Sequence, residues 1–139
     1  MNIVVDTSVW SQALRRRRGS TSPEALELAE LVQEGRAEIL GPVRQELLSG
    51  VSAQEQYETL RDYLRAFPDV ALETEDYELA ASFFSRCRAR GIQGSNTDFL
   101  ICAAAARRRL GILTTDSDFL RFAKLLPIAL HSPRPPMSP

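Results

Sequence analysis

The chain has 139 residues, of which 44% are hydrophobic and 25% are charged. This length and balance are typical of one globular domain with its own core, and they exclude a fibrous or wholly disordered protein. The net charge of −1 at pH 7 excludes a surface that is basic all round, but it leaves room for a local basic patch. No signal-peptide pattern opens the chain and no apolar run reaches about 18 residues, so we expect a cytoplasmic protein without membrane contact.

Short apolar runs alternate along the chain with patterns of helical period. The first run, Ile3 to Val5, is wholly apolar, as expected of a strand that is covered on both faces of a parallel sheet. Further strands are expected at residues 38–40, 70–72, 111–114 and 128–130. Helices are expected to begin near residues 7, 22, 41, 52, 74 and 96, where capping residues or prolines precede apolar stripes.

This alternation predicts an α/β fold, a three-layer α/β/α sandwich with a mainly parallel central sheet. We expect one domain over residues 1–131, without internal repeats or linkers. Residues 132–139 contain four prolines, and we expect them to form a disordered tail. In a fold of this class the ligand site lies outside the carboxyl ends of the strands.

Acidic residues fall where that rule places a ligand site. Asp6 directly follows the first strand, Glu46 lies in the helix after the second, and Asp98 lies in the first turn of a later helix. Asp116 follows the strand at residues 111–114, with Asp118 as a secondary candidate. Carboxylates gathered at one edge are stable when ionised only around cations, and hard oxygen ligands select Mg²⁺ or Mn²⁺. Any one of these acids alone would more simply be a helix cap or a solvated charge, so the interpretation depends on their convergence.

Such a site suits phosphodiester hydrolysis, which needs an activated water, charge relief at the phosphate and help for the leaving oxygen; one or two divalent ions supply all three. The chain offers no competing catalytic set. His131 is the only histidine, so a Ser-His-Asp triad is hard to build. Cys87 and Cys102 lie in apolar helical patterns without the spacing of a zinc site, and we expect buried free thiols.

The segments around the acids resemble the motifs of a known family. These segments are IVVDTSVW, VRQELLSG, NTDFLICAAA and ILTTDSDF. In order and spacing they resemble the four acidic motifs of PIN domains, most closely those of the bacterial VapC-like toxins. With the helical stretches between them, they span the chain up to about Leu130.

The resemblance implies roles for individual residues. It implies a catalytic metal site made of Asp6, Glu46, Asp98 and Asp116. Hydroxyl groups that hold the acids or a water on the metal are implied at Thr7, Ser8 and Thr114. Asp118 matches a position whose role is variable in the family, so its part is secondary.

The resemblance further implies the toxin of a type II toxin–antitoxin pair, a Mg²⁺- or Mn²⁺-dependent endoribonuclease that cuts structured RNA, such as transfer or ribosomal RNA, at a single-stranded loop. It also implies a homodimer and a small VapB-like antitoxin whose carboxy-terminal segment lies over the acidic site. Composition and periodicity indicate none of these properties. A DNA or flap nuclease, an RNA-processing nuclease and a non-catalytic partner-binding module of the same fold remain alternatives, although intact acids count against the last.

Several cationic and aromatic residues have two interpretations each. The candidate RNA-binding residues are Arg15, Arg16, Arg17 and Arg18. They could grip phosphates in bidentate fashion, or they could only place favourable charge at a helix end. Arg86, Arg88 and Arg90 could line an RNA path or form the solvated side of a helix. Trp10 could stack on a base, but packing in the core or a dimer interface is the simpler interpretation.

Other folds that gather acids at strand ends fit less well. A response-regulator receiver has two acids together after its first strand, whereas Asp6 stands alone. A phosphatase of the haloacid-dehalogenase type needs a second aspartate two residues after the first, where this chain has Ser8. A nucleotide-binding domain needs a glycine-rich loop that this chain lacks.

Overall fold

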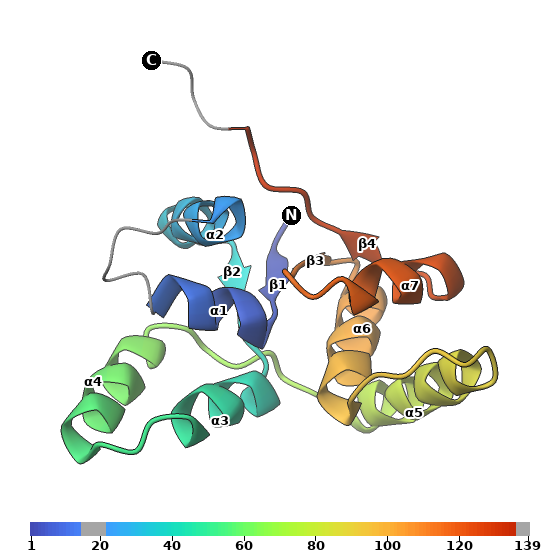
Figure 1. The fold of residues 1–139 in the computed structure, drawn as a ribbon, viewed down its shortest axis with the longest axis horizontal. Coiled ribbons are helices and arrows are strands. Elements are labelled where there is room, and N and C mark those ends of the chain that lie inside the picture. The colour runs from blue at the N-terminus through green and yellow to red at the C-terminus, as the bar shows by residue number, and fades with distance from the viewer. Residues whose placement is uncertain (15–21, 136–139) are drawn as a thin grey trace.

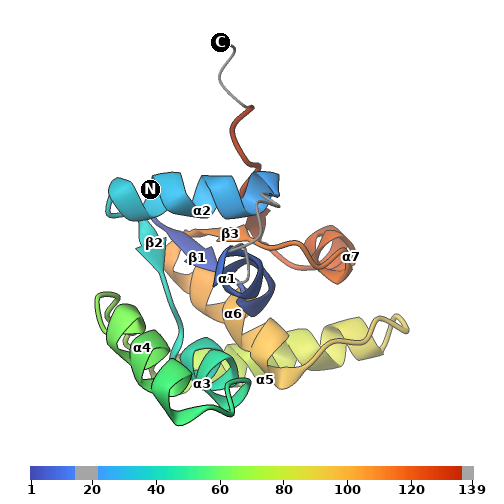
Figure 2. The same cartoon turned by 60° about the vertical axis from the view of Figure 1, so that its left-hand side comes forward.

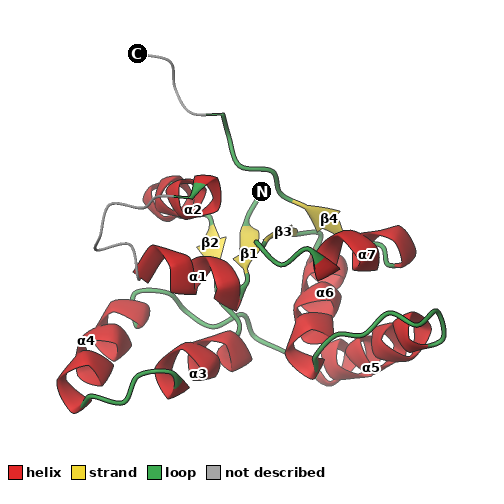
Figure 3. Cartoon of the chain, viewed as in Figure 1, coloured by secondary structure: helices red, strands yellow, loops and turns green. Residues whose placement is uncertain are grey.

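The computed structural model describes residues 1–14 and 22–135. In these ranges strands alternate with helices (Figures 1 and 3). The elements are β1 (Ile3–Val5), α1 (Thr7–Leu14), α2 (Pro23–Gln33), β2 (Ala37–Glu38), α3 (Gly41–Ser49), α4 (Gln54–Leu64), α5 (Thr74–Arg88), α6 (Asn96–Arg108), β3 (Gly111–Leu113), α7 (Asp118–Leu125) and β4 (Ala129–Leu130).

The strands of the described residues form one parallel sheet in the order β2-β1-β3-β4. Ile3 of β1 lies opposite Ala37 of β2 and opposite Gly111 of β3. Every residue of β1 and β3 is buried, which requires cover on both faces of the sheet. The chain runs from β1 outward to β2 and then back past β1 to β3, so the order of the strands reverses at β1. Because crossovers between parallel strands are right-handed, α1 and α2 lie on one face of the sheet and α6 lies on the other (Figure 2). The α/β class with a parallel sheet is as predicted, and the reversal opens a crevice beyond the carboxyl ends of β1 and β3.

The prediction of a strand at residues 70–72 is wrong. Only a single bridge forms there, between Ile39 and Asp69, and the Val70 N–H donates to the Ile39 carbonyl at 3.0 Å. The next carbonyl, that of Ala71, accepts a hydrogen bond from the Arg108 side chain at 2.8 Å instead of from a strand. The Arg108 side chain thus occupies the carbonyl that a neighbouring strand would bind if the ladder continued.

The structure contains one helix that was not predicted from the sequence, α7. Its buried residues Phe119 and Phe122, followed by Leu126, recur at the spacing of an amphipathic helix. The helix has only 8 residues and follows directly on the polar segment Thr114 to Ser117. It covers the sheet beside β4 and starts next to the acidic residues.

Trp10, Cys87 and Cys102 all lie in the hydrophobic core. Trp10 is 0% exposed, and its ring packs edge-on against Phe67 with centroids 5.1 Å apart. It is therefore a core residue in this chain and is not available for stacking on a base. Cys87 and Cys102 are buried free thiols, as predicted, and burial raises the pKa of both.

The segment after β4 crosses α2. Glu27 of α2 is 2% exposed, lies 2.6 Å from His131 Nε2 and accepts hydrogen bonds from Arg134 at 3.1 Å. Arg134 also binds Glu34. These contacts hold His131 and Arg134 on α2. The disordered tail expected at residues 132–139 stays a prediction, and residues 136–139 lie outside the described ranges. None of the described helices is long and apolar enough to cross a membrane.

Candidate functional site

Asp6 lies where β1 ends, and its carboxylate is held by three neighbours. Its Oδ1 accepts the backbone N–H of Thr7 at 2.8 Å, and its Oδ2 accepts the hydroxyls of Ser8 at 2.9 Å and Thr114 at 2.8 Å. Thr114 directly follows β3, so the pairing of β1 with β3 brings the two side chains together. These contacts are of the kind that the resemblance implied for Ser8 and Thr114.

Glu46 reaches the same edge of the sheet from the second turn of α3. The hydroxyl of Thr7 donates to Glu46 Oε1 at 2.7 Å. Pro42, at the first turn of α3, lacks an N–H and its fixed backbone angle suits a helix start, which sets where α3 begins. Thr7 therefore connects two acids, since its N–H binds Asp6 and its hydroxyl binds Glu46.

Asp98 is fixed by the start of α6. Ser95 is the N-cap, and the two residues form a capping box in which the Asp98 N–H donates to Ser95 Oγ and the Ser95 N–H donates to Asp98 Oδ2, both at 3.0 Å. Burial raises the pKa of Asp98, the hydrogen bonds from Ser95 oppose this, and the charges of Asp6 and Asp116 raise it further. Ser95 was not identified from the sequence, although a serine three residues before an acid is a capping pattern that could have revealed it.

Asp116 lies in the turn between β3 and α7, and Asp118 is the first residue of α7. The Asp116 N–H donates to the Thr114 hydroxyl at 3.0 Å, and Asp116 Oδ1 accepts the Asp118 N–H at 2.9 Å. The Asp118 carboxylate binds Arg121. Asp118 thus meets the other acids through its backbone, while its carboxylate is engaged by a neighbouring arginine.

The structure brings Asp6, Asp98 and Asp116 close enough for their charges to interact, and it joins Glu46 to Asp6 through Thr7. Their mutual repulsion fits a place for a cation. Within the described ranges, however, no three Asp, Glu, His or Cys side chains lie close enough together to form a ready-made metal cage. The donor set suits a divalent cation, and holding one requires the carboxylates to turn toward one another.

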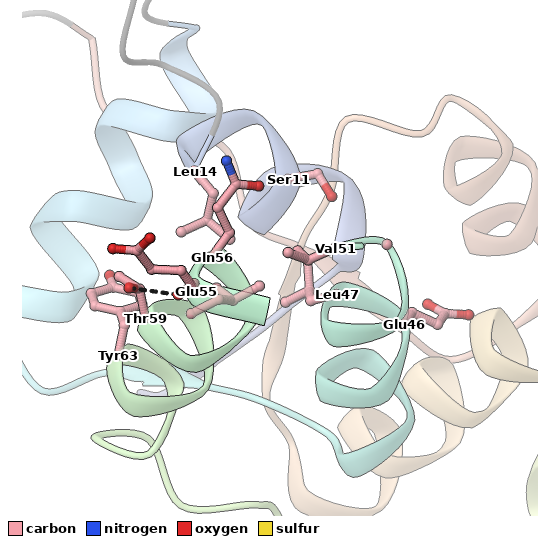
Figure 4. Close-up of a pocket in the computed structure, with 11 residues that line it drawn as sticks. Ser11, Leu14, Glu46, Leu47, Val51, Glu55, Gln56, Thr59 and Tyr63 are labelled. Atoms are coloured by element: carbon pink, nitrogen blue, oxygen red, sulfur yellow. Dashed lines mark hydrogen bonds between the residues drawn. The ribbon is translucent and has the colours of Figure 1, made fainter. Parts of the chain in front are cut away.

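A hollow of about 920 Å³ lies beside Glu46, between α1, α3 and α4 (Figure 4). Its lining includes apolar residues, among them Leu47 and Val51, and the acidic residues Glu46 and Glu55. Glu46 lies at one end of the hollow and Tyr63 at the other (Figure 4). Of the four candidate acids, Glu46 therefore lines the hollow, whose lining is both apolar and acidic.

The arginines singled out in the sequence have different surroundings. Arg15 to Arg18 lie outside the described residues, so their RNA-binding role stays a prediction. Arg86 and Arg88 are exposed at the end of α5, and Arg90 is exposed in the turn that follows it.

Comparisons with known proteins give a consistent picture of the fold. One similar solved structure is FitAcB from Neisseria gonorrhoeae, with 18% identity, a TM-score of 0.73, and coverage of 94% of this chain and 97% of that chain. A second is VapBC2 from Rickettsia felis bound to a DNA fragment from their promoter, with 17% identity, a TM-score of 0.75, and coverage of 94% and 98%. A third is VapBC-5 from Mycobacterium tuberculosis, a member of the VapBC family of toxin-antitoxin systems, with 16% identity, a TM-score of 0.65, and coverage of 94% and 98%. At these identities the likeness concerns the fold.

A search of curated protein sequences found no significant match. The family model described as PIN domain matches residues 3–125, which is most of the chain and includes all four acids. PIN domains are generally nucleases, and they generally use divalent metals. The chain therefore belongs to the PIN domain family.

Proposed function

We propose that this chain is a Mg²⁺- or Mn²⁺-dependent endoribonuclease, the toxin of a type II toxin–antitoxin system, and that it cuts structured RNA such as transfer or ribosomal RNA. The observation that carries the proposal is the link from Asp6 through the Thr114 hydroxyl to Asp116 beyond the carboxyl ends of β1 and β3, with Asp98 near enough for the charges of these two acids to raise its pKa. The family supports hydrolysis of nucleic acid. The toxin role is supported by the likeness to structures such as VapBC-5, which comes from a family of toxin-antitoxin systems.

The acids Asp6, Glu46, Asp98 and Asp116 would hold the cation. A divalent cation bound there supplies an activated water and relieves charge at the phosphate. The role of the protein is to position the side chains that bind the cation. Thr7, Ser8 and Thr114 restrain the carboxylates of Asp6 and Glu46 through the hydrogen bonds described above, and Ser95 restrains that of Asp98. Such restraint fixes the orientation of each ligand and lowers the cost of ordering it when the cation binds.

We infer that the hollow beside Glu46 receives a segment of the antitoxin. The apolar part of its lining fits the apolar face of a peptide, and Glu46 and Glu55 fit a basic side chain on the same peptide. A basic group near Glu46 would compete with the cation, which gives a physical reason for inhibition. The resemblance to VapC-like toxins also leads us to expect a cytoplasmic homodimer.

The test is cleavage of total bacterial RNA by the purified protein, free of antitoxin, with Mg²⁺ or Mn²⁺ and with EDTA. Two variants are run in parallel: Asp98→Asn, and Glu30→Gln as a control with the same type of change on the exposed side of α2. We expect discrete fragments that require metal, persist in Glu30→Gln and disappear in Asp98→Asn. End mapping of the fragments then identifies the RNA.

Other outcomes would favour a different role. Preferred cleavage of DNA under the same conditions would favour a DNA or flap nuclease. RNA that is bound in Mg²⁺ but left intact would favour a partner-binding module. Cleavage that continues unchanged in Asp98→Asn would contradict the proposed site.

A further inference from the structure

The cationic side chains of the described residues differ in whether they form ion pairs. Many are paired with carboxylates, as Arg36 is with Glu34 and Arg107 and Arg108 are with Asp76. Three exposed cations at the junction of α5 and α7 are in no ion pair with any described residue: Arg86, Arg90 and Lys124. We call these three residues the α5–α7 basic surface.

Contacts between the two helices bring these cations together. Arg86 Nη1 donates to the carbonyl of Leu125 at 3.4 Å, and Leu125 is the chain neighbour of Lys124. Arg90 is exposed in the turn that directly follows α5, where its N–H donates to the Cys87 carbonyl at 3.0 Å. The guanidinium of Arg86 also lies over the ring of Phe83, 5.6 Å from its centroid, which limits its conformational freedom.

No carboxylate close in sequence offsets this charge. No Asp or Glu occurs between Glu78 and Asp98, and none occurs after Asp118. Like charges held together on a solvated surface repel, and a bound anion relieves that repulsion. Arg88 provides a contrast, since it lies over Phe84 and lines a separate hollow with Tyr77.

The α5–α7 basic surface is connected to the acidic residues by α7. The helix starts at Asp118, whose N–H binds Asp116, and Lys124 follows six residues later, about 9 Å along the axis. The loop that leads from Arg90 to Asp98 rests on the same helix, because a Cβ at Gly94 would come within 2.6 Å of Phe122. Figure 1 shows α5, this loop and α7 together on the side of α6 away from α4.

We propose that the α5–α7 basic surface binds phosphates of the RNA strand that flanks the bond to be cut. The inference rests on the proposed ribonuclease function, and it names the part of the surface that holds the substrate. Arginine and lysine contacts of this kind fix the position of a strand without reading its sequence. The contacts are electrostatic, so their contribution depends on salt.

The test compares two double variants that remove the same charge: Arg86→Gln/Lys124→Gln at the surface, and Arg88→Gln/Arg109→Gln as the control. Arg109 ends α6 at the pole opposite Asp98. Binding of a fluorescent single-stranded RNA oligonucleotide is measured in Mg²⁺ across a series of NaCl concentrations, in an Asp98→Asn background that prevents cleavage. Melting temperatures check that each variant is folded.

We expect the magnitude of the slope of log K against log salt to decrease by about 1.4 in the surface variant, because each of two phosphates that lose a cationic partner accounts for about 0.7. In the control variant the slope should stay unchanged. In the cleaving enzyme the surface variant raises KM and leaves kcat unchanged. Equal slopes in the two double variants overturn the inference. The proposed ribonuclease function still stands in that case if the wild-type protein cuts RNA. Failure of the wild-type protein to bind or cut RNA overturns the proposed function and this inference together.

Discussion

Short hydroxyl side chains organise the candidate site at the scale of single residues. The Thr114 hydroxyl donates a hydrogen bond to Asp6 and accepts the N–H of Asp116, and it also lies 3.5 Å from the Ser8 hydroxyl. It therefore links the acid after β1 to the acid after β3. An aliphatic side chain of the same shape cannot replace either bond.

Thr114→Val should lower kcat/KM for RNA cleavage by about 10- to 100-fold, the range found when groups that orient metal ligands are removed. Thr115→Val is the matched control, because the Thr115 side chain makes no hydrogen bond with a described residue. Steady-state cleavage measured beside melting temperature separates an effect on the site from unfolding. Equal activity in the two variants would show that the Thr114 hydroxyl does not organise the acids.

The raised pKa of Asp98 makes a prediction about stability without metal. Folding favours the protonated form, so the ionised carboxylate destabilises the metal-free protein increasingly as pH rises above the ordinary aspartate value of 3.8. Asp98→Asn should therefore raise the melting temperature at neutral pH without metal. Mg²⁺ or Mn²⁺ should raise the melting temperature of the wild type more than that of the variant. A variant that is less stable without metal and equally stabilised by it would remove Asp98 from the metal site.

The loop before α6 matters at the scale of elements, because it sets where the capping box and Asp98 lie. Gly94→Ala would place a Cβ 2.6 Å from Phe122 Cζ and 3.0 Å from a ring carbon of Phe99. Such overpacking should destabilise the fold by about 1 to 3 kcal/mol and reduce cleavage, since the loop carries Ser95. Gly50→Ala is the control, where the nearest atoms lie 3.6 and 3.7 Å away, and it should change stability by less than about 0.5 kcal/mol. Chemical denaturation measures both, and equal losses would contradict the close packing of the loop on α7.

The sequence predicted elements well where one local signal was sufficient. The apolar run of β1 and the proline of α3 are examples, and the acids that follow them were located from the same signals. It failed at residues 70–72, where the Arg108 side chain takes a carbonyl that a strand would have used. It also missed α7, whose 8 residues follow a polar turn, and Ser95, whose role depends on the geometry of the loop. In each case the structure depends on a partner that is distant in sequence, or the element is too short to give a clear local pattern.

A buried ionic network joins the start of α5 to the end of α6 at the scale of the whole molecule. Asp76 is 0% exposed and binds Arg108 and Arg107 at 2.7 and 2.8 Å. The hydrogen bonds from Arg108 hold the pKa of Asp76 far below its usual 3.8 although burial opposes them, and the Glu73 backbone bond and Arg107 add to the effect. This lowered pKa stabilises the fold above pH 3.8, and the stabilisation is lost as pH falls below that value toward the folded pKa.

Asp76→Asn should lower the free energy of unfolding at pH 7 by about 3 kcal/mol, because it leaves two arginines without their buried partner. The difference from wild type should shrink as pH falls below 3.8. Asp62→Asn removes an exposed ion pair with Arg61 and should change stability by less than about 0.5 kcal/mol. Urea denaturation at several pH values measures both, and a pH-independent loss in Asp76→Asn would contradict the ionic explanation.

The central claim is that four acids, delivered by different elements, act as one metal-dependent nuclease site. The most direct measurement is cleavage of one mapped RNA substrate in Mg²⁺ by four single variants: Asp6→Asn, Glu46→Gln, Asp98→Asn and Asp116→Asn. We predict that each loses cleavage while remaining folded, and that Glu30→Gln retains it. Retention of full activity by any of the four would contradict the account of the site, and metal-independent cleavage by the wild type would contradict its chemistry.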